Sequence, residues 1–69
     1  NPHENQVIFK NSSSKELIIS IITIQGVLIE ELIVLPNSRY TWLDNHPSGL
    51  RIINFHNSEQ RGRLKLLKL

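Results

Sequence analysis

ELIISIITIQGVLIEELIVL, residues 16–35, is the most apolar stretch of the chain and the one that decides its fold. A membrane-spanning helix needs about 20 predominantly apolar residues, but Gln25 and the adjacent pair Glu30 and Glu31 make this stretch too polar for such a span. An amphipathic helix is also disfavoured, because Gly26 in its middle would cost about 1 kcal/mol and the seven isoleucines are weaker helix formers than Ala or Leu. We therefore expect extended structure here.

The same stretch has the alternation of a strand that folds back at a glycine. Leu17, Ile19 and Ile21 fall on one face of an extended chain and the residues between them on the other, which is the period of two expected of a β-strand. The run TIQG at residues 23–26 predicts the turn, with Gly26 supplying the positive φ that tight hairpins need. Residues 27–35 return as the second strand of a β-hairpin.

Composition and spacing extend this prediction to the whole chain. The sequence contains ten Ile, ten Leu and three Val but no Ala and no Met, which favours strands over helices. Further strands are predicted at residues 6–10, 39–43, 50–55 and 61–69, separated by runs rich in Asn, Ser, Pro and Gly. We expect one all-β domain over residues 1–69, an antiparallel sandwich or barrel of six strands, with residues 1–5 a linker or strand lead-in.

The polar residues argue against several classes of function. Without Cys, neither a disulfide nor a cysteine-based zinc site can form. His3, His46 and His56 are scattered, and no Ser-His-acid arrangement is visible. The net charge of +2 is too small to imply nucleic-acid binding, and the basic residues at the end of the chain have no aromatic residues interleaved with them. We therefore predict no enzyme, no catalytic residue, no metal or cofactor, and no nucleic-acid partner.

The charge is unevenly distributed along the chain. Residues 1–38 carry two lysines against four glutamates, a net charge of −2, whereas residues 39–69 carry six basic residues against two acidic ones, a net charge of +4. The basic half therefore comes last. Because the first residue is Asn1 rather than Met, and no signal-peptide pattern is present, we expect the chain to have been cut from a longer protein.

Three features in a fixed order carry a resemblance to a known family. The dipeptide NP stands at residues 1–2, ISIITIQGVLI at 19–29 leads through a glycine turn, and PSGLRIINF at 47–55 leads to the basic-hydrophobic RLKLLK at 63–68. In this order they resemble the type A C-terminal sorting domain of Bacteroidetes proteins exported by type IX secretion. The resemblance covers essentially the whole chain. The sequence departs from the family pattern at Thr23, Val27, His46 and Arg51, positions that we expect mostly to face solvent.

The resemblance implies a fold and a role. The fold would be a small immunoglobulin-like β-sandwich of six to seven strands at the end of a covalently fused cargo protein. The role would be recognition in the periplasm by an outer-membrane shuttle, passage through the translocon to the cell surface or medium, and removal by a surface sortase. The residues implied as part of the recognition signal are Pro2, Gly26, Pro47, Gly49, Arg63, Lys65 and Lys68.

Each of these residues also has a purely structural explanation. Glycines occur where turns need positive φ, a proline fixes φ before a strand, and edge strands carry basic residues that deter edge-to-edge pairing. Open sheet edges in so short a chain also predict a homodimer through those edges.

The orientation of residues 39–43 is open from sequence. Either Tyr40 and Trp42 face the core, or Thr41 and Leu43 do and Trp42 is an exposed aromatic contact for a partner or a sugar. The second orientation suggests an alternative function, a sugar-binding or adhesive accessory module of a secreted protein.

Overall fold

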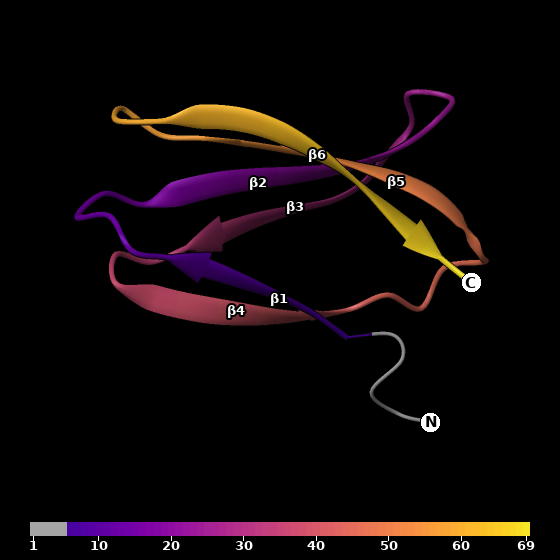
Figure 1. Ribbon diagram of the computed structural model, residues 1–69, viewed down its shortest axis with the longest axis horizontal. Helices are drawn as coiled ribbons and strands as arrows, with labels where there is room; N and C mark the ends of the chain where they lie inside the picture. The colour runs from indigo at the N-terminus through magenta and orange to yellow at the C-terminus, as the bar shows by residue number, and fades with distance from the viewer. Residues whose placement is uncertain (1–5) are drawn as a thin grey trace.

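The structure is a computed structural model that describes residues 6–69, which form six antiparallel strands in two sheets and no helix (Figure 1). A two-stranded sheet pairs β1 with β4, and a four-stranded sheet has the order β3-β2-β5-β6. The strands are β1 (Gln6–Asn11), β2 (Leu17–Thr23), β3 (Leu28–Val34), β4 (Ser38–Leu43), β5 (Gly49–His56) and β6 (Arg61–Lys68). The predicted all-β class and the six predicted strands are confirmed.

The two sheets face each other as a small sandwich, with the smaller sheet lying below the larger one in Figure 1. The β2–β3 and β5–β6 hairpins lie within the four-stranded sheet, and antiparallel pairing of β2 with β5 joins them. The chain crosses between the sheets from β1 to β2, from β3 to β4 and from β4 to β5. This arrangement corresponds to strands B and E opposite C′, C, F and G of an immunoglobulin-like sandwich.

The hairpin predicted from residues 16–35 is present and supplies much of the core. Leu17, Ile19 and Ile21 are buried on the inner face of β2, and the residues between them are only partly buried. Gly26 has a φ of 90° and its N–H donates to the carbonyl of Thr23 at 2.9 Å, which closes the turn. Local alternation therefore predicts this element correctly, because which face a strand residue occupies depends only on its position along the strand.

The burial of Trp42 shows which face of β4 is turned toward the core. Its side chain is 4% exposed and belongs to the core, where it lies across from Val7 of β1. Thr41 and Leu43 are exposed, so the orientation that makes Trp42 a surface contact is wrong. Tyr40 shares the inner face but remains 41% exposed. The buried apolar residues are Leu17, Ile19, Ile21, Leu32, Val34, Trp42 and Ile53.

Asn11 closes one end of the sandwich, although its sequence neighbourhood predicts a loop. It is the last residue of β1 and is 1% exposed. Its Nδ2 donates to the carbonyls of Lys15, Val34 and Leu35 at 2.7, 3.1 and 3.2 Å, and its Oδ1 accepts from the N–H of Ser13 at 3.0 Å. One amide thus ties β1 to the following loop and to the connection between β3 and β4.

Candidate recognition surface

Several of the residues expected in the recognition signal gather at one end of the sandwich. The β2–β3 turn that contains Gly26, the β4–β5 connection that contains Pro47, and the C-terminus all lie there (Figure 1). The turn and the connection border an open hollow of about 470 Å³, which Ile24, Val27, Pro47 and Gly49 help to line. Motifs that are 20 or more positions apart in the sequence therefore form one continuous surface.

A buried ion pair shapes the β4–β5 connection. Asp44, directly after β4, and Arg51, in β5, are both almost fully buried. Arg51 Nε donates to Asp44 Oδ2 at 3.0 Å and Nη2 donates to Oδ1 at 3.3 Å, a two-point contact of guanidinium with carboxylate. Arg51 Nη2 also donates to the carbonyl of Pro47, and the N–H of His46 donates to Asp44 Oδ1 at 3.0 Å. The β4–β5 connection is therefore held in place by the buried ion pair between Asp44 and Arg51.

The expectation that the departures from the family pattern mostly face solvent is wrong for Arg51. Its side chain points inward from β5 and is 4% exposed as a residue. An arginine can occupy this position because the carboxylate of Asp44 and the carbonyl of Pro47 satisfy its guanidinium. A buried charge without such partners would be strongly destabilising.

Lys68 belongs to the same cluster and is anchored rather than free. Its Nζ donates to the carbonyl of Asp44 at 2.7 Å and to the carbonyl of His46, and it lies 3.8 Å from Asp44 Oδ1. The end of β6 is therefore fastened to the β4–β5 connection. Within the expected signal, Lys68 has a structural role that its sequence position does not reveal.

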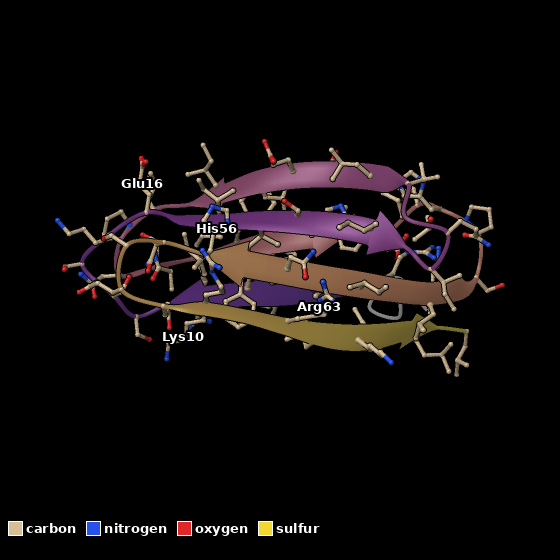
Figure 2. All side chains as sticks on the ribbon, turned by 90° about the horizontal axis from the view of Figure 1, so that it is seen from above. Lys10, Glu16, His56 and Arg63 are labelled. Carbon is tan, nitrogen blue, oxygen red and sulfur yellow. The ribbon has the colours of Figure 1, made fainter. Side chains whose placement is uncertain are left out.

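Arg63 and Lys65 have a different environment from Lys68. Both are exposed on the outer face of β6, where Arg63 lies beside β5 (Figure 2) and its Nε donates to Asn54 Oδ1 at 2.9 Å. β6 is an edge strand of the four-stranded sheet, so the structural explanation of its basic residues also holds. Of the three basic residues in the expected signal, these two are the ones exposed to solvent.

The two glycines of the signal are needed for different reasons. Gly26 has positive φ, but a Cβ there would meet no atom within 4 Å. Gly49 has a φ of 150°, and a Cβ there would lie 3.3 Å from Arg51 Nη1. Both the backbone conformation and the neighbouring guanidinium therefore disfavour a larger residue at position 49. Pro2, the remaining residue of the signal, lies outside the described residues.

The part of the chain from residue 6 onward offers no group of three or more His, Asp or Glu side chains placed to hold a metal ion. His46 lies in the β4–β5 connection and His56 at the far end of β5, and His3 is outside the described range. Within residues 6–69 no helix has the length and apolar character that a bilayer-spanning segment needs.

Asp44 and Asn11 are the residues at the two ends of the sandwich that sequence reasoning missed. Asp44 stands in a run of turn-forming residues, where a carboxylate is usually exposed. The only indication in the sequence was that Asp44 begins this run and Arg51 follows shortly after it.

Comparison of the sequence with models of known protein families finds no match, and comparison with curated proteins finds none either.

Proposed function

We propose that the chain is a sorting domain that directs a covalently attached cargo protein through type IX secretion. The observation that carries the proposal is the ordered set of motifs in the sequence, from NP at residues 1–2 to the basic strand at 63–68, which resembles the type A sorting domain along the whole chain. In this proposal the domain passes through the periplasm, engages the outer-membrane shuttle and translocon, and is removed by a surface sortase.

The arrangement of the motifs supports this proposal. A transport partner that reads folded domains needs a continuous surface, and the glycine turn, the loop at residues 47–49 and the end of β6 lie together at one end of the sandwich. Arg63 and Lys65 extend this surface along β6 with two exposed positive charges. Exposed charges mainly accelerate and orient encounters with an oppositely charged partner.

The alternative function, a sugar-binding module, was suggested by an exposed Trp42, and Trp42 is not exposed. Sugar recognition at a surface needs an accessible aromatic face, and Trp42 lies in the core. Tyr40 keeps partial exposure, but it lies on the inner face of β4, opposite Phe9 of β1. We therefore do not propose this function.

The proposal is tested by fusing residues 1–69 behind a reporter that carries a Sec signal peptide, in a host with type IX secretion. We expect the reporter at the cell surface or in the medium, and in the periplasm when the same host lacks its translocon. A reporter that stays in the periplasm of the competent host would falsify the export function.

A matched pair of double variants tests the role of the basic strand. Arg63→Gln with Lys65→Gln removes the two exposed charges of β6, whereas Lys10→Gln with Arg39→Gln removes a cross-strand basic pair from the smaller sheet. We expect export to fall several-fold for the first variant only, with unchanged circular dichroism for both. Equal export from both variants would show that the charges of Arg63 and Lys65 are not part of the signal.

A further inference from the structure

β6 has two different faces along a free edge of the four-stranded sheet. It pairs with β5 on one side and, within the described part of the chain, with no strand on the other (Figure 2). The side chains of Arg61, Arg63 and Lys65 point to the outside of the sandwich, and all three are exposed. Leu64 and Leu66 alternate with them and point inward. The edge is therefore basic on its outward face and apolar on its inward face.

The three basic side chains of this edge have no acid close enough to balance their charge. The ion pairs of the described residues all involve Asp44, so none of the three has a carboxylate within 4.0 Å. His56, the cross-strand neighbour of Arg61, adds no negative charge. The acids of this sheet, Glu30 and Glu31, are on β3 at the opposite edge. A row of unbalanced positive charges favours a negatively charged partner.

The inward face of the same edge is incompletely covered at Leu64. Its side chain is 46% exposed, although Ile53, directly opposite it on β5, is 1% exposed. β6 is the edge of a sheet of four strands that faces a sheet of only two. A hollow of about 270 Å³ adjoins Leu64, and Phe9, Ile53 and Phe55 are among the residues that line it. An apolar side chain placed beside Leu64 would therefore lie against the core.

We propose that β6 binds an extended peptide segment in which acidic and apolar residues alternate, added to the sheet as a further strand. The backbone N–H and C=O groups on the free side of an edge strand pair with such a segment, and its alternate side chains give specificity. Side chains directly opposite each other on paired strands have Cβ atoms about 4.5–5.5 Å apart. The acidic side chains thus meet Arg61, Arg63 and Lys65, while the apolar ones cover Leu64 and border the hollow.

A second copy of this chain is a poorer match for the edge. Pairing β6 with β6 about a two-fold axis sets the outward residues of both strands against each other, which brings basic side chains together. The free edge of β3 has one outward acid, Glu31, between the apolar residues Leu28 and Ile33. It therefore offers a single acid to three basic side chains. The charges of β6 disfavour strands like itself and favour an acidic one.

Peptide binding to the 69-residue chain, measured by isothermal titration calorimetry, tests the proposal. The probe is a short peptide with blocked ends in which Glu and Val alternate, and the comparison peptide has the same composition with Glu and Val in two blocks. We expect the alternating peptide to have a dissociation constant about tenfold lower or more, because only it places Glu on one face of a strand and Val on the other. Equal affinity, or no binding of the alternating peptide, overturns the proposal.

Charge reversal then locates the contact. Arg61→Glu with Arg63→Glu reverses two charges of β6, whereas Lys10→Glu with Arg39→Glu makes the same change in net charge on the smaller sheet. All four residues are exposed, so both variants should keep the circular dichroism of the unmodified chain. We expect the first variant to bind the alternating peptide about tenfold more weakly or worse, with a much smaller change for the second. Equal loss in both would contradict a site on β6.

A matched apolar pair tests the inward face. Leu64 on β6 and Leu43 on β4 have similar exposure, 46% and 53%, so glutamine at either position should leave the fold intact. We expect Leu64→Gln to weaken peptide binding several-fold and Leu43→Gln to leave it unchanged. In NMR hydrogen exchange, the peptide should protect amides of β6 and not those of β3. Protection at β3 alone would place the added strand at the wrong edge and overturn the proposal.

The biological setting of this contact rests on the proposed sorting function, but the contact itself is measured without export. A reporter retained in the periplasm, together with peptide binding at β6, would count against the sorting function alone. Export without peptide binding would count against the acidic-apolar strand alone.

Discussion

At the scale of single residues, the sandwich is closed by buried polar side chains that have partners for their hydrogen-bonding groups. Every fully buried side-chain nitrogen or oxygen in residues 6–69 has a hydrogen-bond partner. The amide of Asn11 holds the loops together at one end of the molecule, and the Asp44–Arg51 ion pair does so at the other end. Such groups are favourable only while their partners remain, because a buried polar atom without one loses its hydration with no compensation. These residues therefore specify where the loops sit.

Asn11→Asp tests this role with almost no change in side-chain shape. The substitution replaces the Nδ2 donor with an oxygen that faces the carbonyls of Lys15, Val34 and Leu35. An uncompensated buried charge lowers the free energy of unfolding by about 3–5 kcal/mol, about as much as the core of so small a domain supplies. We expect the variant to be largely unfolded by circular dichroism at 25 °C.

Asn45→Asp is the control, because Asn45 is exposed in the β4–β5 connection. Its free energy of unfolding in urea should change by less than about 0.5 kcal/mol. A folded Asn11→Asp variant with the stability of the control would show that the amide network does not close this end of the sandwich.

At the scale of elements, the two connections at the recognition end obey different constraints. The β2–β3 turn is held by two backbone hydrogen bonds and by the N–H of Val27 donating to Thr23 Oγ1, and residue 26 adopts positive φ. The β4–β5 connection crosses between the sheets and is held by the side chains of Asp44, Arg51 and Lys68. Replacing Gly26 affects a local conformation, whereas replacing Gly49, the first residue of β5, also disturbs the buried ion pair.

Gly26→Ala and Gly49→Ala should therefore differ in effect. Placing a side chain at the left-handed conformation of residue 26 lowers the free energy of unfolding by about 1–2 kcal/mol, with no added clash. Gly49→Ala should lower it further, because the new Cβ also crowds the Arg51 guanidinium. Urea unfolding followed by circular dichroism measures both changes. A smaller loss of unfolding free energy for Gly49→Ala than for Gly26→Ala would contradict this prediction. It would mean that the Arg51 guanidinium moves aside for the new Cβ at little cost.

At the scale of the whole molecule, the two sheets are unequal. β2 and β5 each have a paired strand on both sides, whereas β1 and β4 pair only with each other within the described residues. A two-stranded sheet is marginal alone and depends on packing against another layer. Val7, Phe9 and Trp42 provide that packing against the four-stranded sheet. Local opening should therefore begin in the smaller sheet.

Amide hydrogen exchange followed by NMR should reveal this order. We expect the most slowly exchanging amides in β2 and β5, with exchange close to that of global unfolding, and faster exchange in β1 and β4. Comparison at low protein concentration keeps any contact between copies from adding protection. Equal protection in both sheets would indicate that the sandwich opens as a single cooperative unit.

Much of this architecture is predictable from local pattern. Alternation in residues 16–35 predicts the hairpin and its buried face, Gly26 predicts the turn, and the spacing of turn residues predicts six strands. These predictions succeed because a strand residue's face follows from its position along the strand, and because positive φ is a property of one residue.

The environment of particular side chains depends instead on contacts between distant residues. Trp42 faces inward because the four-stranded sheet lies on that side of β4, which alternation within residues 39–43 cannot reveal. Lys68 meets the carbonyl of Asp44 across 24 positions of sequence, and Asn11 meets that of Val34 across 23. Alternation along β6 places Lys65 and Lys68 on opposite faces, but it does not reveal that Lys68 meets the carbonyl of Asp44. Only the packing of the two sheets decides that contact, because burial is a property of the assembled fold.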